Sequence, residues 1–389
     1  MQPNTSVRGS HADIILIDIA ASLSSPSFLT RKSAAAVAEP FAVSEPRSGV
    51  PFDQGLADRY EHRKQWIQAS LAVLHRDFRD RFPLRPDPTH DADLQIRSSS
   101  SANGESGPDL LAYQESLGAM LQSYHEDTDI DLTAISLHEL SLADVYGAVH
   151  SNPLPYWLTL KVAIDKSYEY MIPPQSSFLL GPFTGTIPAF TSFACASANA
   201  NPPGFDFILL DPPWPNRSAH RARHQNAYKT STFDIYDLFK LNVSKGLRAH
   251  GLLGIWVTNS TKWRSFTFDK LFPAWKVRPV AEWLWVKITN SGEPIFALDN
   301  VARKPYESLI FVRPASHDNS DHTPTPALPD KIVFAMPDIH SRKPCLKGLV
   351  EAYLPPEPRC AEIFARNLTE GWFSWGNEVL KGNWRGCWV

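Results

Sequence analysis

Four consecutive residues, Asp211-Pro212-Pro213-Trp214, combine groups that could bind and activate an amine on an aromatic ring. Each proline fixes its φ angle and lacks an N–H donor, so the loop is stiff and presents carbonyl acceptors. A carboxylate and a proline carbonyl could accept both hydrogens of an adenine amine, which would free the nitrogen lone pair to attack a sulfonium methyl group. Asp211 would also accept the proton, and Trp214 offers a flat face for the purine. Positioning supplies most of the rate in such a transfer, so we predict neither a metal nor a covalent nucleophile.

The same four residues could instead form a rigid turn around a packed tryptophan. Their place in the chain favours the first interpretation, because an apolar segment over 205–210 predicts a strand that ends directly before Asp211. Ligands of open α/β sheets bind at the carboxyl ends of the strands.

A basic segment follows the loop, with no acidic residue between Pro212 and Phe233. Such a run is often only a solvated surface. Beside a tryptophan that can stack on a base, contact with phosphates is the better interpretation. The candidate substrate-binding residues of this segment are Asn216, Arg217, Ser218, Arg221 and Arg223.

The composition is that of an ordinary globular protein, with 389 residues, 43% of them hydrophobic and 20% charged. A net charge of -3 excludes binding of nucleic acid over the whole surface, so any contact must be local. The four cysteines have no metal-ligand spacing, which indicates reduced thiols in an intracellular protein without a metal site. The apolar run 14–17 is too short for a membrane span or a signal sequence.

The elements that must position the loop predict an α/β fold. Apolar segments over 205–210, 251–257, 279–288, 306–312 and 332–336 predict strands, and helical spacing falls at 60–80, 234–245, 261–272 and 343–354. Alternating strands and helices imply a mostly parallel sheet covered on both faces. We divide the chain into a partly disordered segment (1–55), a mainly helical accessory region (56–170, with a helix after Pro108) and a catalytic domain (171–389).

Several ordered blocks between about 171 and 380 resemble the adenine-N6 methyltransferases related to the catalytic subunit of the mRNA N6-adenosine methyltransferase. Besides Asp211 to Trp214, the blocks are Phe178 to Leu180, Trp256 to Asn259, Trp285 to Glu293, Lys304 to Glu307, Phe364 to Leu368 and Trp372 to Leu380. The stretch 181–203 looks like an insertion relative to that pattern. The resemblance implies a Rossmann-like methyltransferase fold with S-adenosylmethionine as cofactor.

The resemblance also implies roles for individual residues. Lys343 would pair with the cofactor carboxylate, and the other cofactor-binding candidates, together with Asp211, are Glu362, Arg366, Asn367, Asn377 and Glu378. The substrate-binding candidates outside the basic segment are Trp214, Lys304, Tyr306 and Glu307. Without the family pattern, Glu362, Arg366 and Lys343 would be interpreted as ordinary surface and ion-pair residues. Trp283 and Trp285 are expected in the core.

Three functions stay open at this stage. The first is methylation of adenine N6 in RNA, with 2′-O-methyladenosine of small nuclear RNA as a candidate target and a nuclear location, both implied by the resemblance. The second is methylation of DNA, since both polymers present the same amine and only contacts to the ribose separate them. The third is a non-catalytic RNA-binding subunit, against which the intact Asp211 and Trp214 argue. A cytosine-N4 methyltransferase is a weaker alternative, because such enzymes more often carry Ser in place of Asp211.

Overall fold

The computed structural model describes residues 7–11, 13–23, 36–41, 54–82, 84, 129–131, 139–195, 203–215, 233–300, 303–315, 327–338 and 342–388. The basic residues Asn216, Arg217, Ser218, Arg221 and Arg223 lie outside the described residues, as does the helix predicted after Pro108.

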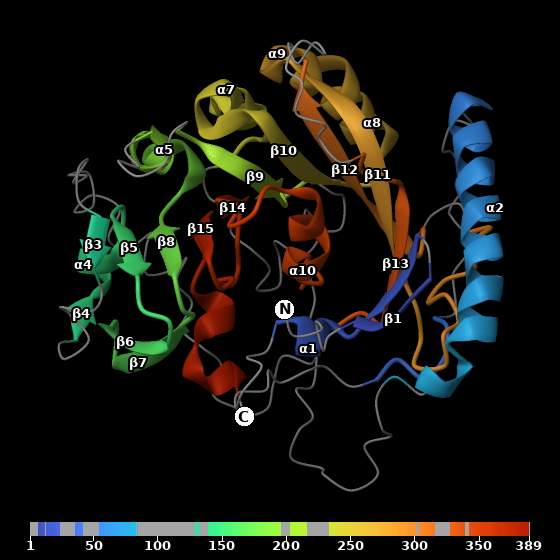
Figure 1. Ribbon diagram of the computed structural model, residues 1–389, viewed down its shortest axis with the longest axis horizontal. Helices are drawn as coiled ribbons and strands as arrows, with labels where there is room; N and C mark the ends of the chain where they lie inside the picture. The colour runs from blue at the N-terminus through green and yellow to red at the C-terminus, as the bar shows by residue number, and fades with distance from the viewer. Residues whose placement is uncertain are drawn as a thin grey trace, which may run out of the picture.

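A twelve-stranded mixed sheet forms the centre of the described structure, in the order β1-β2-β13-β11-β12-β10-β9-β14-β15-β8-β5-β3 (Figure 1). The five adjacent strands β10-β9-β14-β15-β8 are parallel to one another. A small sheet, β4-β6-β7, lies beside it. The strands are β1 (Val7–His11), β2 (Ile14–Ile17), β3 (Asp129–Asp131), β4 (Leu140–Ser141), β5 (Val149–Asn152), β6 (Leu158–Ala163), β7 (Ser167–Ile172), β8 (Ser176–Leu180), β9 (Phe205–Leu210), β10 (Leu247–Val257), β11 (Val277–Lys287), β12 (Tyr306–Pro314), β13 (Lys331–Ala335), β14 (Cys360–Ile363) and β15 (Trp372–Gly376).

Helices cover both faces of the large sheet (Figure 1). Successive residues of a strand point to opposite faces, so neighbouring residues pack against different layers of helices. On β12, Ile310 packs with the helices of one face and Leu309 packs with those of the other. The first face carries α2 (Gln54–Asp77), α5 (Phe183–Cys195), η3 (Ile235–Lys240), α7 (Val243–Gly246), α8 (Thr261–Ser265), the π-helical turn η4 (Phe266–Leu271) and α9 (Phe272–Trp275). The second face carries α1 (Ile19–Ser22), α10 (Lys347–Val350) and η5 (Glu351–Tyr353).

This architecture confirms the predicted α/β, Rossmann-like sheet with helices on both faces. The strand predicted over 205–210 is β9, which is buried along its whole length. Trp283 and Trp285 are core residues, at 1% and 3% exposure.

The accessory region differs from the prediction. Helix α2 confirms the helix expected over 60–80, but residues 140–172 form mainly strands, β4, β5, β6 and β7, with one short helix, α4 (Leu142–Val145). The period-two pattern of β6, in which Leu160 and Val162 are buried around exposed Lys161, marks a strand. β5 pairs with β8 in the large sheet, and the domain boundary predicted at 171 falls inside β7.

The stretch 181–203, expected as an insertion relative to the family pattern, contains α5, which follows β8 and precedes β9. One further expectation is corrected. The helix expected over 343–354 begins only at Lys347. Lys343 precedes Pro344, and a residue before proline is disfavoured in the helical conformation.

Candidate active site

The loop from Asp211 to Trp214 leaves the sheet at the carboxyl end of β9, in the middle of the parallel block. The backbone N–H of Asp211 donates to the carbonyl of Ile363, at 3.3 Å, where β14 ends beside it. The N–H of Trp214 donates to the carbonyl of Pro212, at 2.8 Å. The structure therefore places the predicted catalytic loop at a strand end and holds it in a fixed turn.

The side chain of Trp214 is anchored on one edge. Its Nε1–H donates to the carbonyl of Trp256 at the end of β10, at 2.7 Å. Its ring lies 6.3 Å from Trp263 and 6.5 Å from Phe266 between centroids, and the indole N–H of Trp263 donates to the carbonyl of Pro215, at 2.7 Å. The C-terminal end of the loop is thus tied to β10 and α8, as its start is to β14, and the half-buried Trp214 ring has a fixed orientation.

A cluster of alternating charges surrounds the carboxylate of Asp211. The Nζ atom of Lys343 lies 2.9 Å from Asp211 Oδ2 and 3.1 Å from Glu307 Oε2. Glu307 also accepts a hydrogen bond from Lys287. The ammonium of Lys343 lies 5.4 Å from the ring centroid of Trp256, the residue whose carbonyl anchors Trp214. The candidate catalytic carboxylate is therefore part of a network joining three strands and the segment before α10.

The network fixes the charge of its members. Burial opposes the positive charge of Lys343, but the carboxylates of Asp211 and Glu307 outweigh it and raise the pKa of Lys343. Burial likewise opposes ionisation of Glu307, yet Lys343 and Lys287 lower its pKa to about 2. Both groups are therefore charged at neutral pH.

Glu362, on β14 beside β9, behaves differently. Burial, with a contribution from the like charge of Asp211, raises the pKa of Glu362 to about 8, against the opposing effect of Lys343. A carboxyl group with this pKa is largely protonated at neutral pH, and it can then donate as well as accept a hydrogen bond.

The ends of β14 and β15 bring the remaining cofactor candidates together. Nε of Arg366 lies 3.2 Å from Glu378 Oε2, and Lys381 also pairs with Glu378. Gly376 lets the two strand ends approach closely, because a Cβ atom there would lie 2.6 Å from the carbonyl oxygen of Ala365. Asn367 and Asn377 lie on the same two segments, with Asn377 exposed.

These groups fit S-adenosylmethionine in their chemistry. Acidic and amide oxygens at two adjacent strand ends suit the hydroxyls of a ribose, and a cation suits a carboxylate. Lys343 is engaged by Asp211 and Glu307, but an ammonium has three donors and can serve a third acceptor.

Two substrate candidates lie away from this cluster. Tyr306 and Glu307 are consecutive on β12, so their side chains point to opposite faces of the sheet. Glu307 joins the cluster at Asp211, whereas Tyr306 is buried against α2. The ammonium of Lys304 lies 4.6 Å from the ring centroid of Tyr60, on that same side.

Three residues at the candidate active site were not among the predicted site residues. Lys287, Trp256 and Trp263 contact the catalytic loop or the predicted site residues, and the first two belong to motif blocks that the sequence already singled out.

No group of three or more metal-ligating side chains occurs within the described ranges. No helix of the described part is long and apolar enough to cross a membrane.

Residues 205–378 match the MT-A70 family. This chain carries an MT-A70 domain. The match begins at β9 and ends at Glu378, so it contains the catalytic loop, the Lys343 cluster and the strand ends just described. The resemblance predicted from sequence is confirmed, and its motif blocks are also similar to those of methyltransferase-like protein 4.

The names of individual relatives agree with the MT-A70 match. The chain is 41% identical over 219 residues to the N(6)-adenine-specific methyltransferase METTL4 of Mus musculus, which covers 55% of this chain and 44% of the relative. It is 40% identical over 250 residues to the N6-methyladenosine RNA methyltransferase MTA1 of Pyricularia oryzae, covering 63% of each. A DNA N6-methyl methyltransferase of Caenorhabditis elegans is 30% identical over 213 residues, covering 54% of this chain and 53% of the relative. The chain thus spans 44% to 63% of the length of these relatives.

Proposed function

We propose that this protein transfers a methyl group from S-adenosylmethionine to the N6 amine of adenine in a nucleic acid. The observation that carries the proposal is the placement of the Asp211 carboxylate. It stands at the carboxyl end of a central parallel strand, 2.9 Å from the Lys343 ammonium and on a loop whose Trp214 ring is fixed. That is the edge where ligands of α/β sheets bind, and the MT-A70 match contains it.

The loop would act on the amine of the target base. The Asp211 carboxylate and a proline carbonyl of the loop accept the two amine hydrogens, and this hydrogen bonding makes the nitrogen lone pair available. Asp211 then holds the proton that the nitrogen releases. The ring of Trp214, unable to turn because its N–H is bonded to Trp256, positions the purine. A base in a duplex would first have to leave its stack.

S-adenosylmethionine, when bound, supplies a methyl group on a sulfonium leaving group. The residues we assign to its binding are Lys343 for the carboxylate, and Glu362, Arg366, Asn367, Asn377 and Glu378 for the ribose and its surroundings. Lys343 therefore has two tasks, since it also orients Asp211.

We favour RNA over DNA as the substrate, with 2′-O-methyladenosine of small nuclear RNA as a candidate target and the nucleus as the location. RNA is supported by the name of the Pyricularia oryzae relative, which matches 63% of this chain. The name of the Caenorhabditis elegans relative supports DNA, so DNA is the second candidate. The basic run 216–224 is a proposed phosphate contact in either case.

One assay tests the proposal. Purified protein with labelled S-adenosylmethionine is offered RNA, 2′-O-methylated RNA and single-stranded DNA of one sequence. We expect label at adenine N6 of an RNA, and loss of at least 100-fold with Asp211→Ala. Transfer to DNA alone overturns the RNA assignment. Cofactor binding without transfer to any oligonucleotide favours a non-catalytic nucleic-acid-binding subunit instead.

A further inference from the structure

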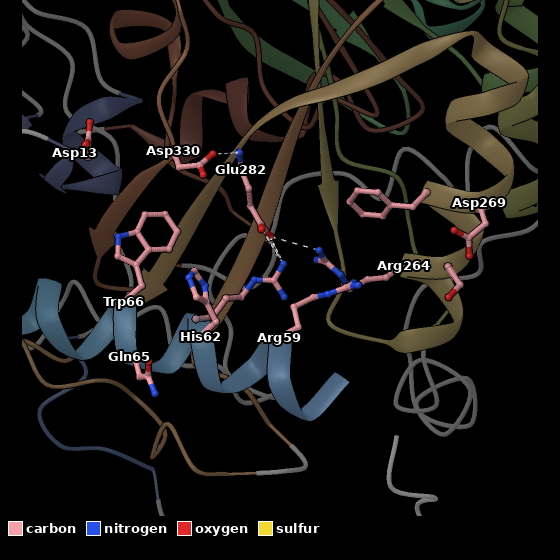
Figure 2. A pocket seen from close by; sticks show the side chains of 12 residues that line it. Asp13, Arg59, His62, Gln65, Trp66, Arg264, Asp269, Glu282 and Asp330 are labelled. Carbon is pink, nitrogen blue, oxygen red and sulfur yellow. Dashed lines mark hydrogen bonds and ion pairs between the residues drawn. The ribbon is translucent and has the colours of Figure 1, made fainter. Parts of the chain in front are cut away.

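A polar cavity lies on the opposite face of the sheet from Lys343 and Asp211. It has a volume of about 1000 Å³ and is bounded by α2, α8 and β11 (Figure 2). Helix α2 precedes the MT-A70 match in the chain, so this cavity combines the domain with a segment outside it. None of the groups that we assign to methyl transfer lines it.

Two buried arginines meet on one carboxylate in this cavity. Arg63 of α2 and Arg264 of α8 are only 5% and 4% exposed. Nη2 of Arg63 lies 2.7 Å from both carboxylate oxygens of Glu282, and Nη2 of Arg264 lies 3.5 Å from Oε1. Figure 2 shows Glu282 reaching from β11 toward Arg264. Two buried cations therefore share a single anion.

The guanidinium groups have donors left over. Nη1 of Arg63, and both Nε and Nη1 of Arg264, are buried without a hydrogen-bond partner among the described residues. A buried charged donor without an acceptor costs free energy, and native structures rarely leave one unmatched. The ring centroid of Phe268 lies 5.4 Å from the Arg264 guanidinium carbon and packs against this group. The arginine end of the cavity thus offers spare donors to an incoming acceptor.

The charge balance at this end is positive. Burial and the nearby cations Arg63 and Arg59 lower the pKa of Arg264 to about 10, and Glu282 only partly compensates. Arginine stays protonated in proteins, so three cations, Arg59, Arg63 and Arg264, stand beside the single carboxylate of Glu282 at this end.

The other carboxylates of the cavity do not neutralise that charge. Asp13 and Asp330 lie at the opposite end, beside Trp66 (Figure 2). Asp330 accepts the backbone N–H of Glu282, at 2.7 Å, and Asp13 pairs with Lys331, at 3.6 Å. Asp269 lines the cavity from the π-helical turn, but its charge is not among those that shift the pKa of Arg264.

The cavity adjoins the catalytic loop through α8. Trp263, which holds the carbonyl of Pro215, is followed directly by Arg264. Tyr60 of α2 donates from its hydroxyl to the carbonyl of Asn259, just before α8. An anion bound at Arg264 would therefore contact the residue directly after Trp263, whose indole N–H supports the catalytic loop.

We propose that Arg59, Arg63 and Arg264 bind a phosphate group of the polynucleotide substrate, outside the nucleotide whose base enters the catalytic loop. The inference rests on the proposed function, because a polynucleotide at Asp211 carries phosphates on either side of its target base. Guanidinium donors match phosphate oxygens in geometry and charge. Glu282 orients the two buried arginines, and their spare N–H groups are left for the phosphate.

Three variants of the full chain test the site. Arg264→Lys keeps the buried charge but removes the Nε and Nη1 donors, while Arg59→Ala removes an exposed cation and leaves the Arg63–Glu282 pair intact. Arg79→Ala removes an exposed arginine just beyond α2 and is the matched control. We expect Arg264→Lys and Arg59→Ala to weaken oligonucleotide binding about 5- to 10-fold. The salt dependence should flatten by roughly one phosphate contact in Arg59→Ala, which loses a charge, and should not change in Arg264→Lys or Arg79→Ala, the first of which keeps its charge.

Titration with inorganic phosphate and with adenosine monophosphate identifies the source of the phosphate. One outcome is that inorganic phosphate or adenosine monophosphate binds the wild type and loses affinity in Arg264→Lys, while the oligonucleotide affinity of that variant is unchanged. The cavity then serves a free small molecule, and the polynucleotide assignment is wrong. Equal oligonucleotide binding by all three variants also overturns it, provided that all three unfold at the wild-type temperature. If the wild type transfers no methyl group but Arg264→Lys and Arg59→Ala still weaken oligonucleotide binding, the phosphate site stands and the proposed activity fails.

Discussion

The Nζ atom of Lys343 lies 2.9 Å from Oδ2 of Asp211, although 132 residues separate the two in the chain. The contact joins the end of β9 to the segment before α10, so the lysine that we propose for the cofactor carboxylate lies beside the proposed catalytic carboxylate. Lys343 therefore connects the two halves of the proposed site, because it orients the catalytic carboxylate and remains able to bind a third acceptor.

Removal of the Lys343 charge should damage both halves. In Lys343→Met, Asp211 and Glu307 lose their shared cation, so we expect the free energy of unfolding to fall by about 3 kcal/mol. S-adenosylmethionine binding should weaken at least 10-fold in calorimetric titration. Lys347→Met is the control, because it removes a lysine that pairs with Glu351 and not with Asp211 or Glu307. It should change the free energy of unfolding and the cofactor affinity by less than Lys343→Met does. Unchanged cofactor affinity in Lys343→Met would show that the lysine serves the protein carboxylates alone.

Loosening the anchor of Trp214 should affect turnover more than folding. Trp214→Phe keeps an aromatic face but loses the 2.7 Å hydrogen bond to the Trp256 carbonyl. We expect a kcat/KM about 10-fold lower, because the purine platform is no longer fixed. Cofactor affinity should be unchanged. Trp275→Phe is the matched control, since it loses a similar bond to the Leu238 carbonyl inside the core. A control that loses as much kcat/KM would show that the effect of Trp214→Phe is one of stability.

The pKa of Glu362 predicts a pH dependence of stability. Its folded pKa of about 8 lies above the ordinary value of 4.5, so the folded state binds the proton more tightly than the unfolded state. Stability should therefore fall as pH rises from about 4.5 to about 8 and then level off. Glu362→Gln cannot ionise, so it should gain on the order of 1–3 kcal/mol relative to wild type between these limits. Urea unfolding at pH 5 and pH 8.5 measures this gain, and an equal difference at both values would contradict it.

Local patterns in the sequence were sufficient for the strand that leads into the loop and for the loop itself. The run 205–210 is apolar enough to be a central strand, and Asp211 follows it, so the position of the loop could be predicted without a structure. The separation of Tyr306 from Glu307 could also have been predicted, because neighbouring residues of a strand face opposite ways.

Tertiary contacts account for what the sequence did not predict. Nothing local marks Arg63 and Arg264 as neighbours, since they meet only when α2 packs across β11. The pairing of Lys343 with both Asp211 and Glu307 likewise depends on the order of strands in the sheet. The strands of residues 140–172 were missed although β6 carries a period-two pattern and is as long as β9, which was predicted.

A methyl group at Gly376 should separate the strand ends that hold the cofactor candidates. In Gly376→Ala the new Cβ would lie 2.6 Å from the backbone oxygen of Ala365, and backbone cannot rotate away as a side chain can. We expect a loss of about 1–3 kcal/mol in unfolding free energy and at least 10-fold weaker S-adenosylmethionine binding, because Arg366 and Glu378 flank the contact. Gly254→Ala on β10 meets only side chains, at 3.3 Å and beyond, and serves as the control. If both variants lose stability but only Gly376→Ala loses cofactor affinity, the close approach of β14 and β15 is a requirement of the binding site; equal cofactor affinity in both would remove these strand ends from it.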